Sequence, residues 1–204
     1  MFIVVVLSCF IIAPFVPFIV QKSGRHAGWL LSLLPLMLFG YFLSWSPAVG
    51  NGEKLMFRWD WVPSLGINLA FRLDGLGLLF ALLVCGIGVF IHIYGAAYLR
   101  DHPLLPRFYL YLMVFMGSML GLVLADNVFA LFVFWELTSI TSYLLIGFEH
   151  ESTAARQAAL QALLITGSGG LSLLAGFILL AHVQGSTDIS QMLGMRSGDP
   201  SYLV

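Results

Sequence analysis

The sequence predicts an all-α polytopic membrane protein of about six transmembrane helices, with a short extracytoplasmic β-hairpin between the second and third. Of its 204 residues, 60% are hydrophobic and only 9% are charged, and the mean hydropathy is +0.97. A soluble domain carries about 25% charged residues, so this chain lacks the polar surface of a water-soluble protein. Nine Lys and Arg against ten Asp and Glu leave no basic face for nucleic acid.

Six apolar runs define the predicted spans, because a helix needs about 20 residues to cross a bilayer. They are residues 2–20, 27–45, 76–99, 108–125, 128–148 and 157–183. Pro14, Pro17 and Pro35 lie inside two of these runs, and membrane helices tolerate proline better than soluble helices do. The first run lacks the basic start and the cleavage site of a signal peptide, so we expect it to be retained as a span.

The links between spans predict the local topology. Asp126-Asn127 is nearly the whole link between the fourth and fifth spans, which predicts an antiparallel helix pair with Asp126 as the N-cap of the fifth. The longest link covers residues 46–75. It alternates aromatic and polar residues around Pro63-Ser64-Leu65-Gly66, a pattern that predicts a β-hairpin lying on the membrane face.

The distribution of Lys and Arg predicts how the chain is oriented. The short loops after the first, third and fifth spans hold Lys22, Arg25, Arg100, Arg107 and Arg156. The opposite side holds Lys54, Arg58, Arg72 and Arg196 over a far longer stretch. Short loops rich in Lys and Arg stay in the cytoplasm. We therefore expect a multi-pass protein of the cell membrane, the inner membrane of a bacterium, with both termini and the hairpin on the extracytoplasmic side.

Glu136 is the one charged residue that falls clearly inside a predicted span. It lies about eight residues, or roughly 12 Å, from the extracytoplasmic end of the fifth span. A carboxylate at that depth costs several kcal/mol unless it is paired, hydrated or protonated. A carboxyl group whose protonation depends on a nearby cation can relay protons, and this is the interpretation we favour. The alternative is a neutral structural Glu that is hydrogen-bonded to a neighbouring helix.

Other polar residues inside the spans are candidates for the same pathway. Ser139 and Tyr143 follow Glu136 by three and seven residues, which places them on one helix face. Their hydroxyls can hold water for proton transfer or can bond to the helix backbone, and both interpretations stay open. His92 lies in the third span, where an imidazole can carry protons near neutral pH or make an interhelical hydrogen bond.

The sixth span contains Ser168, Ser172 and Gly176 at intervals of four residues. Small residues at this spacing let membrane helices approach closely, so we predict that they serve helix packing. The run TGSGG at 166–170 has a second interpretation, because it could loosen the helix. Broken helices of that kind line the cavities of transporters.

Four segments carry a family resemblance. They are FRLDGLGLLFALLV at 71–84, HIYGAAYLRD at 92–101, FYLYLMVFMGSMLGLVLADN at 108–127 and FVFWELTSITSYLLIGF at 132–148. In this order they resemble the N-terminal part of the antiporter-like subunits shared by respiratory complex I and Mrp-type cation/proton antiporters. The resemblance covers residues 1 to 185 and is strongest to the large A-type subunit of Mrp-type Na⁺/H⁺ antiporters, which is similar to subunit 5 of complex I.

The resemblance implies roles for particular residues. Glu136 matches the family's glutamate in the fifth span, a proton-pathway residue required for transport. Arg72 and Asp74 match the motif that leads into the third span, where a structural role at the junction of hairpin and helix is expected. His92 and Tyr94 match a polar patch near the cytoplasmic half-channel. The resemblance implies neither a redox cofactor nor a metal in this subunit.

The chain departs from the family pattern in its length. Family members have about fourteen helices or more, built from two inverted repeats with flanking spans. The lysine of the family's seventh helix, expected to pair with the glutamate of the fifth, has no counterpart here. We therefore interpret residues 1–204 as a single membrane domain, a fragment or split part of such a subunit, with residues 184–204 as an interhelical loop cut short.

The predicted function is transport and not enzymatic catalysis. We expect a proton-pathway subunit, or part of one, in a multisubunit antiporter that couples outward movement of Na⁺ (or Li⁺ or K⁺) to inward movement of H⁺. Its partners would be the other subunits of a hetero-oligomeric complex and the lipid bilayer. Two alternatives stay open: a proton-pumping membrane subunit of a complex I-like or hydrogenase-type respiratory complex, and a purely structural or assembly subunit.

Overall fold

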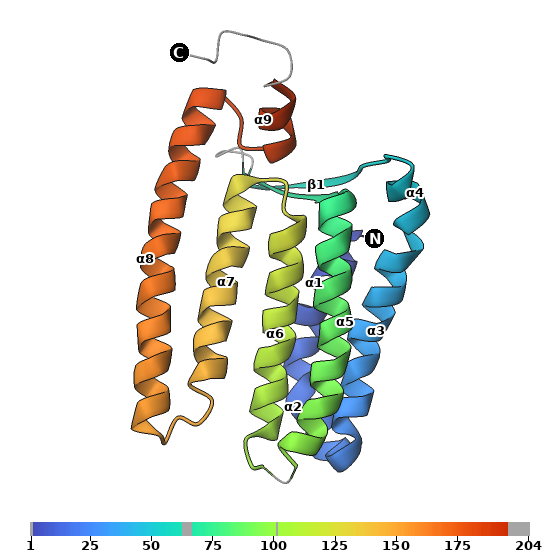
Figure 1. Ribbon diagram of the computed structural model, residues 1–204, viewed down its shortest axis with the longest axis vertical. Coiled ribbons are helices and arrows are strands. Elements are labelled where there is room, and N and C mark those ends of the chain that lie inside the picture. Colours follow the sequence, from blue (N-terminus) through green and yellow to red (C-terminus); the bar gives the residue numbers. More distant parts are fainter. Residues whose placement is uncertain (1, 63–66, 101, 196–204) are drawn as a thin grey trace.

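The computed structural model describes residues 2–62, 67–100 and 102–195. Within these residues six helices are long and apolar enough to cross a membrane, and two strands pair at one end of the helical bundle (Figure 1). The predicted class, an all-α polytopic membrane protein with one small hairpin, is therefore confirmed. The predicted spans differ from the observed helices by only a few residues at their ends.

The helices follow the predicted order along the chain. The first span consists of α1 (Phe2–Ile12), a 3₁₀ turn η1 (Ala13–Phe15) and α2 (Val16–Ser23), and it is followed by a second turn η2 (Gly24–His26). The other spans are α3 (Ala27–Ser44), α5 (Gly75–Tyr98), α6 (Leu105–Leu124), α7 (Val128–Ile146) and α8 (Thr153–Gln184), with the short helices α4 (Ser46–Gly50) and α9 (Ile189–Met195). The first span changes to a 3₁₀ turn at Pro14 because proline has no N–H to donate to the helical ladder.

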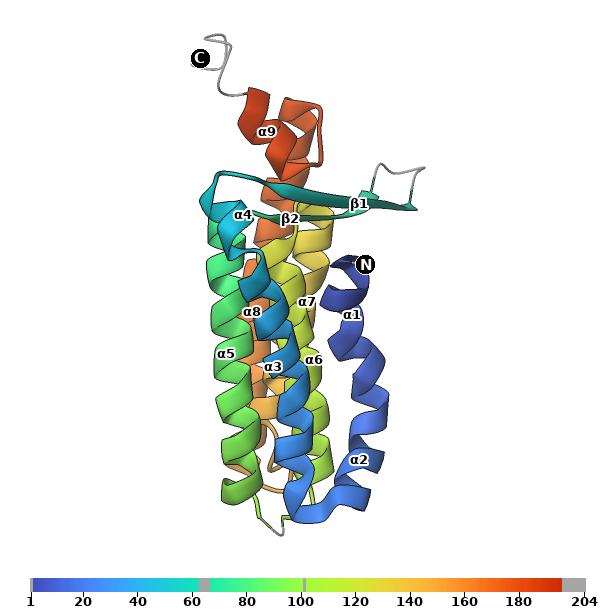
Figure 2. The same cartoon turned by 90° about the vertical axis from the view of Figure 1, so that its right-hand side faces the viewer.

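The hairpin consists of β1 (Leu55–Val62) and β2 (Ile67–Leu73), which pair antiparallel with Leu55 opposite Leu73. The two strands lie across one end of the bundle (Figure 2). Phe71 of β2 is fully buried, and its ring lies 5.9 Å from that of Phe134 on α7. The predicted turn at 63–66 lies outside the described residues.

The helix α6 is central to the packing, since it contacts α1, α2, α5 and α7. At its contact with α7, a Cβ on Gly121 would overlap the ring of Phe134, so the glycine permits a close approach. The helix α8 lies at the edge of the bundle, where it packs along α7 (Figure 1). Large apolar side chains such as Leu164 and Leu171 project from its outward face and are more than 60% exposed in the isolated chain.

Three interpretations that the sequence offered differ from the structure in detail. The N-cap of α7 is Asn127, whose side-chain oxygen accepts from the N–H groups of Phe129 and Ala130, while the carboxylate of Asp126 is engaged elsewhere. The run 166–170 does not break its helix, because α8 continues through it to Gln184. The segment expected to be a loop from residue 184 onward contains the helix α9, and its described part ends at residue 195.

Candidate functional site

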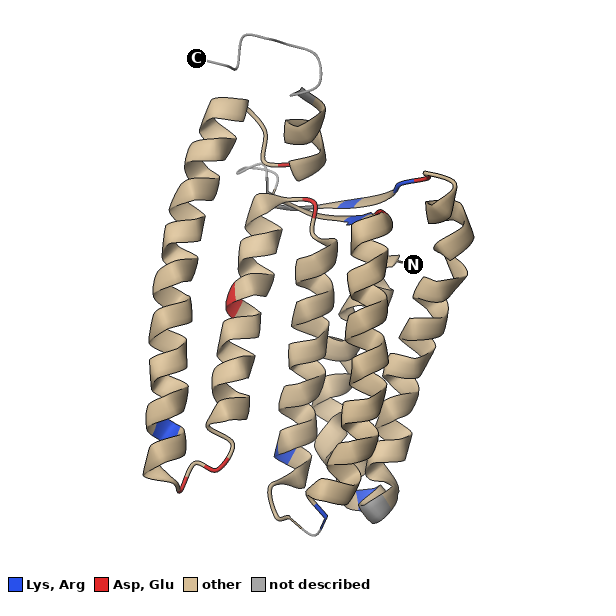
Figure 3. Cartoon of the chain, in the orientation of Figure 1, with Lys and Arg blue, Asp and Glu red and all other residues tan. Residues whose placement is uncertain are grey.

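Charged residues gather at the two ends of the helices, apart from one acidic position within α7 (Figure 3). That position is Glu136, near the middle of the helix. Other charged residues of the spanning helices, such as Lys22, Arg107 and Arg156, lie in a first or last turn, where water or headgroups are close. Among the Asp, Glu, Lys and Arg residues that the structure describes, Glu136 is therefore the only one in the interior of a span.

The carboxyl group of Glu136 points into the contact between α7 and α8. Its Oε1 atom is buried and has no hydrogen-bond partner among the described residues. The group lies against the backbone of Gly170 on α8, and the rest of the side chain is half-buried. A buried acceptor without a partner is rare in proteins and expensive at membrane depth. A proton, a water molecule or a cationic neighbour would satisfy this oxygen, and the described residues supply no hydrogen-bond partner to it.

The sequence does not indicate that Gly170 lies beside Glu136, because the register of α7 against α8 is visible only in the structure. Gly147 meets Ala159 near the link between α7 and α8, where a Cβ on the glycine would lie 3.2 Å from that of the alanine. Eleven residues from this contact along each helix, Glu136 meets Gly170. Eleven residues correspond to about three helical turns, so both contacts belong to one face of an antiparallel pair.

The two hydroxyl residues predicted to follow Glu136 lie on α7 as expected. Ser139 is buried, and its hydroxyl donates to the backbone oxygen of Trp135 at 3.2 Å. Tyr143 is half-buried one further turn along the helix. The structure thus records the backbone-bonding role of the Ser139 hydroxyl, which is common for serine inside helices.

His92 lies apart from Glu136, because it is on α5 and the helix α6 stands between α5 and α7 (Figure 1). The imidazole is fully buried, its Nδ1 donates to the backbone oxygen of Gly88 at 2.7 Å, and its ring stacks on that of Tyr109. This bond fixes the tautomer and leaves Nε2 as an acceptor without a partner among the described residues.

A cavity of ≈ 200 Å³ lies beside His92, between α5 and α6. Apolar side chains such as Ile87, Leu112 and Met116 form most of its wall. Tyr94, which the resemblance places in the same polar patch, is 63% exposed and stacks on Tyr98. The described residues therefore do not join His92, Tyr94 and Glu136 into one site.

The predicted packing ladder of α8 faces outward from this chain. Ser168, Ser172 and Gly176 are exposed, and a Cβ on Gly176 would meet no atom within 4 Å. The two serine hydroxyls donate to backbone oxygens of their own helix. Against α7, the small residues of α8 that are buried are Ala159 and Gly170.

At the hairpin end, Arg72 and Asp74 join the sheet to the start of α5. Arg72 pairs with Asp74 at 2.8 Å, and the Asp74 carboxylate accepts from the N–H of Gly77 at 2.9 Å as the N-cap of α5. Arg72 also lies 3.8 Å from the carboxylate of Asp126 in the turn between α6 and α7. One arginine thus links the hairpin to two helix junctions.

A second set of contacts ties the segment after α8 to the same place. The Asp126 carboxylate accepts from the N–H of Ser190 at 3.0 Å and from its hydroxyl. Asp188 accepts from Asn127 at 3.1 Å and pairs with Arg58 of β1 at 2.7 Å. We call this set of residues the hairpin-end polar cluster, which consists of Arg58, Arg72, Asp126, Asn127, Asp188 and Ser190. Its acidic members are almost fully buried, so they depend on these partners.

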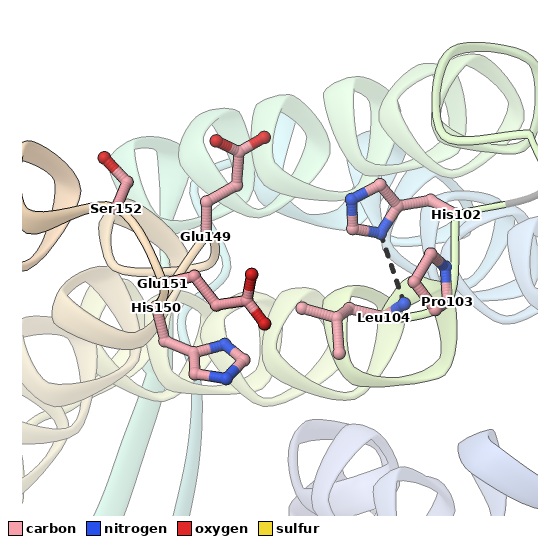
Figure 4. Close-up of a pocket in the computed structure, with 7 residues that line it drawn as sticks. All are labelled: His102, Pro103, Leu104, Glu149, His150, Glu151 and Ser152. Carbon is pink, nitrogen blue, oxygen red and sulfur yellow. Dashed lines mark hydrogen bonds between the residues drawn. The ribbon is translucent and has the colours of Figure 1, made fainter.

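The opposite end of the bundle has a cleft of ≈ 450 Å³ between the loops before α6 and before α8 (Figure 4). Its walls include His102, Glu149, His150 and Glu151, and the N–H of Leu104 donates to the His102 ring at 3.2 Å. Glu136 is not among the residues that line this cleft. In the described part of the chain, no group of three His, Cys, Asp or Glu residues is arranged to hold a metal ion.

Comparison with protein families identifies two segments. Residues 125–202 match the family described as "NADH:quinone oxidoreductase/Mrp antiporter, TM", and residues 59–109 match "NADH-Ubiquinone oxidoreductase (complex I), chain 5 N-terminus". Among curated proteins, the chain is 44% identical over 184 residues to the A1 subunit of a Na(+)/H(+) antiporter of Staphylococcus aureus, covering 90% of this chain and 23% of that protein. It is 43% identical over 172 residues to the A1 subunit of Staphylococcus haemolyticus, covering 84% and 21%. The chain thus spans about a fifth of the length of these relatives.

Two solved structures resemble the fold. The structure of the Mrp complex from a Dietzia species matches with a TM-score of 0.82 and 35% identity, over 97% of this chain and 21% of that one. The membrane-bound sulfane sulfur reductase, an archaeal respiratory membrane complex, matches with a TM-score of 0.74 and 16% identity, over 92% and 29%. At that identity the second likeness concerns the fold alone.

The hairpin-end polar cluster generates a stability prediction. Asp126→Ala removes the acceptor of two bonds from Ser190 and leaves the amide of that residue without its partner, a loss of about 1–3 kcal/mol. We expect faster hydrogen exchange of the amides of residues 188–192, with little change in those of α3. Glu149→Ala, which changes an acid at the other end, is the control and should leave both unchanged. Equal exchange in the two variants would show that the cluster does not hold this segment.

Proposed function

The chain belongs to the family of NADH:quinone oxidoreductase and Mrp antiporter membrane subunits, as the N-terminal part of an A-type antiporter subunit, and we propose that it supplies a proton-pathway element of a multisubunit Na⁺/H⁺ antiporter. The observation that carries the proposal is Oε1 of Glu136, a buried carboxyl oxygen in the middle of α7 that has no hydrogen-bond partner among the described residues. Relatives of this chain are named as antiporter subunits, which favours exchange of Na⁺ for H⁺ over proton pumping in a respiratory complex.

The chemistry of Glu136 suits a site that is loaded and unloaded with protons. Its carboxyl group lies against the backbone of Gly170, where Oε1 receives no hydrogen bond from the described residues. A positive charge that came close to a carboxyl group in this place would stabilise its ionised form. A cation that approaches the group would therefore release the proton, and a cation that leaves would recover it.

The positive partner of Glu136 would come from outside the described residues. No Lys or Arg occupies the interior of a described span, and the ion pairs seen here lie at the hairpin end of the bundle. This chain covers only 23% and 21% of the lengths of those relatives. We propose that a basic residue of a further segment, or of another subunit of a hetero-oligomeric complex, provides the charge.

We also propose an orientation in the cell membrane. The end of the bundle opposite the hairpin carries Lys22, Arg100, Arg107 and Arg156 in or beside short loops, and η2 contains Arg25. Such loops stay in the cytoplasm. The hairpin, the segment after α8 and the start of α1 would then face the extracytoplasmic side.

A charge-neutral substitution tests the role of Glu136. Glu136→Gln and Glu136→Ala should reduce Na⁺-driven proton exchange about 100-fold, the scale on which a lost proton-transfer group acts. The measurement is the collapse of a pH gradient on addition of Na⁺ or Li⁺ to everted vesicles from an antiporter-deficient host that expresses the assembled complex. Glu149→Gln, which changes an acid at the loop before α8, should transport normally. Normal exchange by Glu136→Gln, with assembly intact, would remove this residue from the mechanism.

Accessibility to a membrane-impermeant maleimide tests the orientation. In a chain whose Cys9 and Cys85 are changed to serine, Lys54→Cys at the hairpin end should be labelled in intact cells. Lys22→Cys, at the end of α2, should be labelled only after the membrane is permeabilised. Both positions are exposed, so a failure to react reports the side of the membrane. The reverse pattern would invert the proposed topology.

The outward ladder of α8 supports a second role, in assembly. Because Ser172 and Gly176 are exposed small residues, we expect Ser172→Leu and Gly176→Leu to reduce co-purification of partner subunits while the chain itself stays in the membrane. Gly40→Leu is the matched control, since a Cβ there also meets no atom and the residue lies on α3. Full assembly of the α8 variants would assign this face to lipid.

A further inference from the structure

The middle of α8 contains three glycines with different surroundings. A Cβ on Gly167 or Gly169 would meet no atom within 4 Å. A Cβ on Gly170 would overlap Oε1 of Glu136 and would lie 3.3 Å from its Cδ. Glycine inside a helix is less stable than alanine, so it is expected where something else occupies the position of the Cβ. At residue 170 that occupant is the carboxyl group of another helix.

We infer that Gly170 is a positioning residue for the proton-carrying carboxyl group. The inference rests on the proposed function of Glu136, and it adds a residue of a different helix to that site. The missing side chain leaves a recess in the surface of α8, and the carboxyl group of Glu136 fills it. Gly170 is itself buried, as this arrangement requires.

The recess determines where the carboxyl group can be. A Cβ on Gly170 would also lie 3.5 Å from Cδ1 of Trp135, an ordinary contact, so the crowding falls on the carboxyl group and not on the indole. A methyl group at residue 170 would force the Glu136 side chain to another rotamer and out of the α7–α8 contact. Overpacking of this kind shifts the equilibrium between a carboxyl group inside the recess and one outside it by about tenfold.

A role for Gly170 in helix packing alone makes a different prediction. The α7–α8 contact also includes Gly147 and Ala159, which pack without any polar side chain. If Gly170 only allowed the helices to approach, an added methyl group would harm the protein whichever residue stood at 136. If Gly170 positions the carboxyl group, shortening the acid by one methylene removes the clash. Glu136→Asp therefore separates the two roles.

The test measures Na⁺-driven proton exchange by the assembled complex in vesicles, with four variants. Gly170→Ala should lower the rate about tenfold, and Gly169→Ala, which adds the same methyl group one residue away, should leave it unchanged. In the Glu136→Asp background, adding Gly170→Ala should change the rate by less than about twofold. An equal loss with either acid would overturn the inference in favour of simple packing.

A chemical readout makes the inference independent of transport. A hydrophobic carbodiimide reacts with protonated carboxyl groups within membranes, and mass spectrometry of the α7 peptide gives the rate at Glu136. Gly170→Ala should raise this rate about tenfold by expelling the group from its recess, whereas Gly169→Ala should not. Equal labelling of these two variants would refute the inference. The proposed function is tested separately, by the loss of Na⁺-driven proton exchange expected in Glu136→Gln.

Discussion

A buried carboxyl oxygen without a partner, in the middle of an apolar helix, is the constraint on which the interpretation of this structure depends. Water outside a bilayer can solvate a carboxylate, whereas the hydrocarbon region offers only what the protein itself provides. Around Oε1 of Glu136 the described residues provide the backbone of Gly170 but no hydrogen-bond donor. The missing hydrogen-bond partner destabilises the folded chain, and it also suits this residue to the proton exchange that we propose.

The polar groups at the hairpin end, in contrast, are paired with one another. There Arg58 pairs with Asp188, Arg72 lies beside Asp126, and Asn127 donates to Asp188. These contacts connect the strands, the turn between α6 and α7, and the segment leading into α9. Each buried acid in that cluster has a partner, so the cluster is suited to fixing the geometry of the bundle end. The acids of the hairpin-end polar cluster are thus paired and can hold the end of the bundle rigid. Oε1 of Glu136 has no partner among the described residues, and the proposed function requires that this carboxyl group change its protonation state.

The small residues of α8 between Ser168 and Gly176 lie on two different faces of the helix. Gly170 faces α7 and accommodates Glu136, whereas Ser172 and Gly176 face away from the chain. A glycine in a helix costs about 0.5–1 kcal/mol relative to alanine, yet α8 is continuous through this run. The small residues therefore do not break the helix, and at Gly170 the missing side chain leaves room for the carboxyl group of Glu136.

The sequence by itself determined the six spans, the hairpin and the depth of Glu136, because hydrophobic length and the position of one charge are local properties. It also indicated Asp74 at the start of α5 through a motif. Only the tertiary structure separated His92 from Glu136, moved the N-cap of α7 to Asn127 and turned the ladder of α8 outward. It alone placed Gly170 against the acid. These features depend on helix rotation and on which helices are neighbours, and in a membrane the uniformly apolar faces of the spans leave little amphipathic signal from which to read them.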